Sequence, residues 1–322
     1  MIRILLFASL LIAPPPPPEG MSAQDPDEEK GQFLSLTWEF DVDMVRTMRT
    51  MQEHIQVVSR KTEKEVVESL KKNGFSLIHG VLTPRESGGR AYVAMYKDFL
   101  VIAFRGTKSA STKELVSNII SDLDVRRKKM EWLSGEAKDV DNYREIRVHR
   151  GFAKEYLRFR GDVFKAVDEN RGKPIFVFGH SLGAALATLC AFDIRVSRDR
   201  DVHVYISGSP RVGGDEFREA FETEIKVCVR ITVGDDPFPR IPPRRMGYAH
   251  AGRLLALERD GTRIPTDKIR ANMVVGTFSD HNNRFYREVV QKFLDRCRKD
   301  PEQLEEKRAL RKAADAERVS KE

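Results

Sequence analysis

The stretch Gly179-His180-Ser181-Leu182-Gly183 decides which fold the chain is expected to adopt. It follows the apolar run Ile175-Phe176-Val177-Phe178 and precedes a segment of small, apolar residues at 184–192. This order predicts a strand, a sharp turn and a helix, with a serine at the turn. The flanking glycines carry no Cβ, so that neighbouring backbone segments can pass closely. A serine at such a turn exposes its Oγ, and we therefore predict that Ser181 is a nucleophile.

The composition is that of a globular protein with a charged surface. The chain has 322 residues, of which 33% are charged, and its net charge is +7. The densest basic stretches are Arg126-Arg127-Lys128-Lys129 and the C-terminal tail, which we interpret as solvated surface, with attraction to anionic lipid head groups as the alternative. No nucleic-acid-binding motif is present, and no partner protein is implied.

Cysteine usage gives no support for a disulfide framework or a metal site. The three cysteines, Cys190, Cys228 and Cys297, are far apart in the sequence and form no C-x-x-C pattern. We expect Cys190 and Cys228 to be buried as small apolar residues. No metal and no organic cofactor is expected.

The N-terminal region differs from the rest of the chain. An apolar run at 4–13 is shorter than the roughly 20 residues that a membrane-spanning helix needs. It resembles the core of a signal peptide, but the prolines at 14–18 disfavour cleavage directly after it. Secretion, an uncleaved membrane anchor and a disordered leader remain open. The expected domains are a leader with a proline-rich, acidic linker at 1–32, a catalytic domain at 33–298 and a charged helical tail at 299–322.

Strand and helix patterns alternate through most of the remaining chain. Hairpin strands are expected at 91–96 and 99–104, and further strands around 175–178, 202–207, 226–233 and 254–258. Helical patterns cover 33–72 with a polar break, and then about 148–170, 182–197, 215–222 and 284–297. Such alternation predicts an α/β fold with a central, mostly parallel sheet and helices on both faces. Functional sites in such sheets form at the carboxyl ends of the strands.

A nucleophilic serine needs a base, and the base needs an orienting carboxylate. When a serine lies at the turn of a strand–turn–helix of this kind, the acid and then the histidine come later in the chain. Of the seven histidines, only His203, His250 and His281 follow Ser181. His203 begins a predicted strand and is expected to be structural. His281, in a polar loop before the last helix, is favoured as the base over His250, for which a hydrogen bond within a turn is the simpler role.

Two adjacent aspartates are candidates for the orienting carboxylate. Asp235 and Asp236 both stand at the end of a predicted strand, before a loop with prolines at 237, 239, 242 and 243. Proline would keep that loop rigid, which suits a carboxylate that must orient an imidazole. The position in the sequence does not separate the two.

Several separate segments of the chain resemble one protein family, and they occur in the same order as in that family. The chain is similar to the class 3, fungal lipase-like, lipases of the α/β-hydrolase superfamily over roughly residues 75–297. The segments that carry the resemblance are Phe104-Arg105-Gly106-Thr107, Ile120-Ser121-Asp122-Leu123-Asp124, Val148-His149-Arg150-Gly151-Phe152, Gly179 to Gly183, Gly208-Ser209-Pro210-Arg211-Val212-Gly213, Asp236-Pro237-Phe238-Pro239-Arg240-Ile241-Pro242-Pro243, Tyr248-Ala249-His250-Ala251-Gly252 and Asp280-His281.

The resemblance implies a role for each site residue. It favours Asp236 as the acid, because the family's aspartate opens a D-x-x-P-x-x-P-P stretch, and it treats His250 as structural and His281 as the base. The N–H groups of Thr107 and Leu182 are implied as oxyanion donors. The chain departs from the family at Pro237-Phe238, where an aliphatic pair is more common.

The resemblance also implies a lid and a function. Residues 108–121 occupy the place of the family's short amphipathic lid helix, and their apolar face would consist of Leu115, Val116, Ile119 and Ile120. The ordinary alternative is a packed surface helix. The expected activity is hydrolysis of acylglycerols or related lipid esters through Ser181, His281 and Asp236, at a membrane or droplet surface. Phospholipase A1 activity, a non-lipid esterase and a catalytically silent lipid-binding protein are the alternatives.

Overall fold

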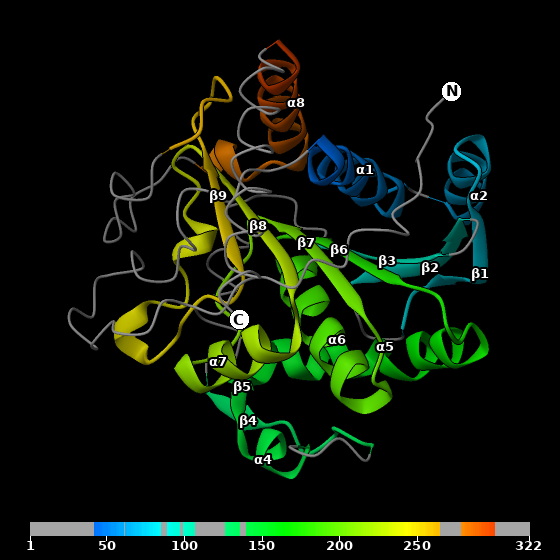
Figure 1. The fold of residues 1–322 in the computed structure, drawn as a ribbon, viewed down its shortest axis with the longest axis vertical. Coiled ribbons are helices and arrows are strands. Elements are labelled where there is room, and N and C mark those ends of the chain that lie inside the picture. Colours follow the sequence, from blue (N-terminus) through cyan, green and yellow to red (C-terminus); the bar gives the residue numbers. More distant parts are fainter. Residues whose placement is uncertain are drawn as a thin grey trace, which may run out of the picture.

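A computed structural model describes residues 42–60, 62–84, 89–96, 99–106, 126–135, 140–264 and 278–299. Its centre is a seven-stranded sheet with the order β1-β2-β3-β6-β7-β8-β9 (Figure 1). The strands are β1 (Ser76–Leu82), β2 (Arg90–Tyr96), β3 (Phe99–Arg105), β6 (Ile175–His180), β7 (Val202–Ser207), β8 (Val227–Val233) and β9 (Arg253–Leu257). A separate two-stranded sheet pairs β4 (Arg127–Lys129) with β5 (Arg147–His149).

The central sheet is mixed but mostly parallel, as predicted. The edge formed by β1, β2 and β3 is antiparallel, and each successive pair from β3 through β6, β7 and β8 to β9 is parallel. Parallel neighbours align their carboxyl ends at one edge of the sheet. The segments that follow β6, β7 and β8 therefore meet at that edge.

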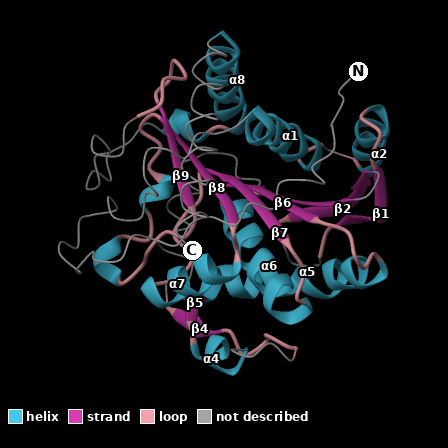
Figure 2. Cartoon of the chain, in the orientation of Figure 1, coloured by secondary structure: helices cyan, strands magenta, loops and turns pink. Residues whose placement is uncertain are grey.

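Helices cover both faces of the sheet, which confirms the predicted architecture (Figure 2). Helices α5, α6 and α7 pack on one face, and α1, α2 and α8 pack on the other. The helices are α1 (Val42–Val58), α2 (Glu63–Lys72), α4 (Val140–Glu145), α5 (Arg150–Glu169), α6 (Leu182–Arg198), α7 (Asp215–Glu224) and α8 (Asn283–Lys299). Short 3₁₀ turns are η2 (Phe238–Arg240), η3 (Arg244–Met246) and η5 (Phe278–His281).

Alternation along the strands divides the core into two layers. In β3, Leu100 and Ile102 belong to the layer under α5 and α6, whereas Val101 and Ala103 belong to the layer under α1 and α8. This follows from the period of two residues along a strand. Every residue of β6 is buried, as expected for a central strand covered on both faces. The strand that ends at the Ser181 turn therefore lies in the most protected part of the molecule.

The first two helices show how local sequence sets an element boundary. The break in the helical pattern of 33–72 falls between α1 and α2, where Thr62 accepts a hydrogen bond from the Glu65 N–H and Glu65 accepts one from the Thr62 N–H. This reciprocal capping box starts α2. The edge strand β1 was not predicted. Its sequence SLIHGVL shows no clear alternation of apolar and polar residues, and its register with β2 shifts between Ile78 and Val81.

Parts of the predicted architecture lie outside the described residues. These are the N-terminal leader and linker, Thr107, the lid segment at 108–121 and the C-terminal tail from residue 300. Among the helices in the described ranges, none is both long and apolar enough to cross a membrane.

Candidate active site

The turn at Ser181 is strained and closely packed. Strand β6 ends at His180 and helix α6 begins at Leu182, so that Ser181 alone connects them, with φ 58° and ψ −129°. Non-glycine residues rarely adopt this backbone region, and such strain is concentrated at functional sites. A Cβ at Gly179 would lie 2.2 Å from the Gly183 carbonyl oxygen, and one at Gly183 would lie 2.4 Å from the Phe104 carbonyl oxygen. Both glycines are therefore required by the close approach of backbone segments.

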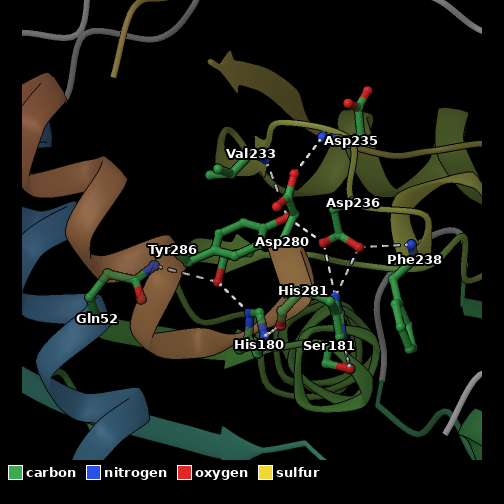
Figure 3. A network of polar contacts seen from close by, with 11 residues as sticks. Gln52, His180, Ser181, Val233, Asp235, Asp236, Phe238, Asp280, His281 and Tyr286 are labelled. Carbon is green, nitrogen blue, oxygen red and sulfur yellow. Dashed lines mark hydrogen bonds and ion pairs between the residues drawn. The ribbon is translucent and has the colours of Figure 1, made fainter. Parts of the chain in front are cut away.

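Ser181 lies within hydrogen-bond distance of the predicted base. The Ser181 Oγ and the His281 Nε2 are 2.7 Å apart, although the two residues are 100 positions apart in the sequence (Figure 3). The Nδ1 of His281 lies 3.0 Å from Asp236 Oδ1 and 2.9 Å from Oδ2. A carboxylate only accepts hydrogen bonds, so Nδ1 carries the ring proton and the lone pair of Nε2 faces the serine hydroxyl. The structure thus brings three of the predicted residues together in a line.

The environment of Asp236 keeps its carboxylate charged. Burial by itself would raise the pKa of Asp236, but the adjacent His281 and three hydrogen bonds to the carboxylate hold that pKa below its usual value. The donors are the His281 ring, the Tyr286 hydroxyl, which lies 2.5 Å from Oδ2, and the Phe238 N–H, which lies 2.9 Å from Oδ1. Burial and the same carboxylate raise the pKa of Tyr286 well above its usual value, so that Tyr286 remains a donor.

Asp280, which directly precedes His281, joins the histidine loop to the aspartate loop. Its Oδ2 accepts the Asp235 N–H at 3.0 Å and forms an ion pair with Arg259 Nη2 at 3.0 Å. The carboxylate is buried, whereas the Arg259 side chain is half exposed just beyond the end of β9. These contacts join the 3₁₀ turn that carries His281 to the segments that follow β8 and β9.

Glycines also shape the space around the His281 ring. A Cβ at Gly208 would lie 3.1 Å from His281 Cε1 and 3.2 Å from Asp236 Oδ2. Gly106 lies against the nucleophile, because a Cβ there would be 3.2 Å from the Ser181 Cβ. The segments that end β3 and β7 therefore approach the serine and the histidine through positions without side chains.

The remaining candidates lie elsewhere or have other partners. Asp235 directs its side chain to solvent, with 66% exposed, and it does not contact His281. His250 is buried and its Nε2 lies 2.5 Å from the Pro239 carbonyl oxygen, and His203 stacks on Phe176. Leu182 begins α6, and its N–H belongs to the first turn, where helical N–H groups have no partner within the helix. Thr107, Leu115, Val116, Ile119 and Ile120 lie outside the described residues.

Several residues around the site were not predicted. His180, Phe238 and Tyr286 contact His281 or Asp236, the Ser207 carbonyl oxygen accepts the Ser181 N–H, and Asp280 accepts the N–H of Asp235. His180 and Asp280 lie in segments that resemble the family, and Phe238 replaces an aliphatic residue of the family pattern, but no role was assigned to any of the three. Within the described ranges, no group of three or more histidine, cysteine, aspartate or glutamate side chains is arranged to hold a metal ion.

Comparison with known proteins gives consistent matches. Residues 101–246 match the family model for lipase (class 3). The secreted mono- and diacylglycerol lipase 1 of Fusarium solani is 34% identical over 142 residues, which cover 43% of this chain and 42% of that protein. The phospholipase A1-II 5 of Oryza sativa subsp. indica is 36% identical over 98 residues, covering 28% of this chain and 21% of that protein. The matched segments thus span less than half the length of either relative.

Among solved structures, the lipase of Rhizomucor miehei in its propeptide complex is similar, with a TM-score of 0.58 and 20% identity. The match covers 73% of this chain and 79% of that one, and at this identity it concerns the fold. The mixed sheet, the two helical layers and the strained serine turn match the α/β-hydrolase fold of these structures. Residues 101–246 of this chain are similar to the class 3 lipases.

Proposed function

We propose that this protein is a serine hydrolase that cleaves the carboxylic esters of acylglycerols or related lipids. Ser181 is the nucleophile, His281 the general base and acid, and Asp236 the carboxylate that orients the imidazole. The observation that carries the proposal is the line from Ser181 Oγ through the imidazole to Asp236, with contacts of 2.7 Å and 2.9 Å. Similarity to the class 3 lipases supports the lipid substrate class.

The reaction follows from the proton positions. His281 Nε2 takes the proton from the Ser181 hydroxyl as Oγ attacks the ester carbonyl carbon, and the carbonyl electrons move to the oxygen. When the tetrahedral intermediate collapses, the bond to the leaving alcohol breaks and Nε2 donates the proton to that oxygen. Water then attacks the acyl-enzyme with the same help, which releases the fatty acid and restores Ser181. The charged Asp236 stabilises the imidazolium in both steps.

The oxyanion would be bound by backbone N–H groups. Leu182 is suited to this role because it directly follows Ser181 at the start of α6, where the helix dipole favours negative charge. Thr107 is the second proposed donor. Its neighbour Gly106 packs against Ser181, which is consistent with a donor near the serine oxygen. Donors aimed at the developing oxyanion each contribute a factor on the order of 10²–10³ in kcat.

The lid remains part of the proposal. Residues 108–121 directly follow Thr107, and their apolar face of Leu115, Val116, Ile119 and Ile120 would cover the site in water and contact lipid at an interface. This predicts that activity rises when the substrate concentration passes its aggregation point, and that polar substitutions at Leu115 and Ile119 reduce the rise. A linear response through that point, unchanged in those variants, would contradict the lid.

A second candidate function is phospholipase A1 activity. It is favoured by the similarity to a rice protein named as a phospholipase A1, and the same three residues would serve that reaction. A substrate panel of triacylglycerol, diacylglycerol, monoacylglycerol and phosphatidylcholine separates the two. If fatty acid is released mainly from phosphatidylcholine, phospholipids and not acylglycerols are the substrate class.

The test of the hydrolase proposal is the variant Ser181→Ala, assayed on a short-chain p-nitrophenyl ester and on emulsified acylglycerols. We expect loss of turnover with an unchanged unfolding temperature. Thr188→Ala is the matched control, because it removes a buried hydroxyl of α6 that donates to the Ala184 carbonyl oxygen within the same helix. Turnover that persists in Ser181→Ala would overturn the proposal.

A further inference from the structure

A line of buried hydrogen bonds connects helix α1 to the backbone of His281. Gln52 Nε2 of α1 lies 3.4 Å from Ser207 Oγ at the end of β7, and Ser207 Oγ lies 3.0 Å from His180 Nδ1. The other ring nitrogen, His180 Nε2, lies 3.0 Å from the carbonyl oxygen of His281 (Figure 3). The exposed fractions of Gln52, Ser207 and His180 are 1%, 0% and 6%. None of these residues takes part in the proposed reaction steps.

The direction of each hydrogen bond in this line follows from the last acceptor, which is the carbonyl oxygen of His281. A carbonyl oxygen only accepts hydrogen bonds, so His180 Nε2 carries a hydrogen and donates a hydrogen bond to the carbonyl oxygen of His281. Burial and the neighbouring His281 lower the pKa of His180 to about 3, so the ring is neutral and Nδ1 must accept. Ser207 therefore donates its hydroxyl proton to Nδ1, and its oxygen accepts the N–H of Gln52. If the Gln52 amide were rotated, its oxygen would face Ser207 and accept the Ser207 hydroxyl hydrogen. Ser207 would then no longer donate to His180 Nδ1.

His180 contacts the proposed base in a second way. Its ring stacks on the His281 ring, with centroids 4.9 Å apart and an interplanar angle of 28°, and meets the Tyr286 ring edge-on at 5.1 Å. A shift of His180 would therefore disturb both the main chain and the imidazole of His281. Proton transfer is sensitive to such displacement, because the base must stay within about 2.6–3.2 Å of the serine oxygen.

Gln52 has a feature that burial alone does not explain. Its amide oxygen finds no hydrogen-bond partner among the described residues. A buried, unsatisfied oxygen destabilises the folded state, and an apolar residue of similar shape at this position would avoid that cost. Residues that reduce stability in this way are expected where function requires them.

We propose that Gln52, Ser207 and His180 are positioning residues that hold His281 in line with Ser181. This inference rests on the proposed hydrolase function. It assigns a role in catalysis to α1, a helix that precedes the region matched by the lipase family model. The three residues act through the carbonyl group and the ring face of His281.

The test measures kcat, KM and unfolding temperature for Gln52→Met, which keeps the side-chain volume and removes the N–H donor. We expect kcat to fall by about threefold to tenfold, the effect of one neutral hydrogen bond expressed in the transition state, with KM nearly unchanged. The unfolding temperature should stay the same or rise. A purely structural Gln52 would give the opposite result, with a lower unfolding temperature and an unchanged kcat, and that result would overturn the inference.

Two further variants make the test specific. Ser207→Ala should lower kcat by a similar factor of about threefold to tenfold, and the double variant Gln52→Met/Ser207→Ala should be no worse than Ser207→Ala, because Gln52 acts through Ser207. Ile55→Val is the matched control on α1, since Ile55 is equally buried, and it should lower stability without changing kcat. If the losses of kcat in the two single variants add up in the double variant, this would contradict an action of Gln52 through Ser207.

The outcome for the wild-type protein separates this inference from the proposed function. If the wild-type protein hydrolyses no ester and does not react with a fluorophosphonate, the proposed function fails and the positioning role fails with it. If the wild-type protein is active and both single variants retain its kcat, the positioning role fails alone.

Discussion

The ring of Phe238 lies flat against the imidazole of His281, with centroids 3.4 Å apart and an interplanar angle of 9°. His180 packs against the same imidazole, so that two rings restrict its rotation. The N–H of Phe238 also donates to Asp236, which places the backbone and the side chain of this residue in the same site. The aromatic ring stands where an aliphatic residue is more common in the class 3 lipases.

The stacking predicts a rate effect of Phe238→Leu. The face of an aromatic ring attracts a cation more than a neutral group, and His281 becomes an imidazolium in the transition state. We expect kcat to fall by about twofold to thirtyfold, which corresponds to roughly 0.5–2 kcal/mol, with little change in KM. Phe217→Leu is the control, because Phe217 is comparably buried but packs against Phe192 and Phe221. Equal kcat values in the wild-type protein and in Phe238→Leu would contradict this role.

The contact between Asp280 and the aspartate loop predicts that Asp280→Asn lowers activity. The carboxylate accepts the Asp235 N–H and pairs with Arg259, so its loss loosens the loop that carries Asp236. Hydrogen bonds to charged groups contribute more free energy than neutral ones, so kcat should fall on the order of tenfold to a hundredfold. Arg259 is half exposed, so Arg259→Gln should have a smaller effect and should change little in the Asp280→Asn background. Full activity in Asp280→Asn would show that the charge of Asp280 and its ion pair with Arg259 do not position the site.

Buried histidines predict a loss of stability on mild acidification. Burial lowers the pKa of His54 and of His180 from 6.5 to about 3, and it lowers the pKa of His250 well below 6.5. At pH values between the lowered pKa of the folded protein and 6.5, the unfolded chain binds more protons than the folded protein. The free energy of unfolding therefore falls as the pH decreases below about 6.5. Each histidine contributes about 1.4 kcal/mol per pH unit in that range.

Urea unfolding at about pH 7.5 and about pH 5.5 measures this dependence, and the midpoint should be lower at the acidic pH. His54→Gln should reduce the difference between the two midpoints, since it removes one of the groups that the unfolded chain protonates. A midpoint that is the same at both pH values would show that these histidines are not held neutral by the fold.

The turn at Ser181 was predictable because its signal is local. The apolar strand, the two glycines and the helix that follows are adjacent in the sequence, and the strained φ of Ser181 follows from the space between them. The choice between Asp235 and Asp236 could not be made from strand position alone, because neighbouring residues at a strand end point in different directions. The family resemblance favoured Asp236, and the structure places the Asp236 carboxylate beside His281, 45 residues later, while Asp235 is exposed.

The supporting contacts could not be predicted because they join distant segments. Gln52 and Ser207 are 155 residues apart, and Tyr286 and Asp236 are 50 residues apart. Neither tyrosine in a helix nor glutamine in a helix carries a signal for such a partner. Phe238 was visible as a departure from the family pattern, but its stacking on His281 depends on how the loop after β8 folds back over the sheet edge.

The most direct test is reaction of the wild-type protein with a short-chain fluorophosphonate, followed by peptide mass spectrometry. We expect one covalent adduct, on the Oγ of Ser181, and no adduct in His281→Ala, because the serine then lacks its base. An unmodified Ser181 in the wild-type protein, or an adduct on a different serine, would contradict the assignment of Ser181 as the nucleophile.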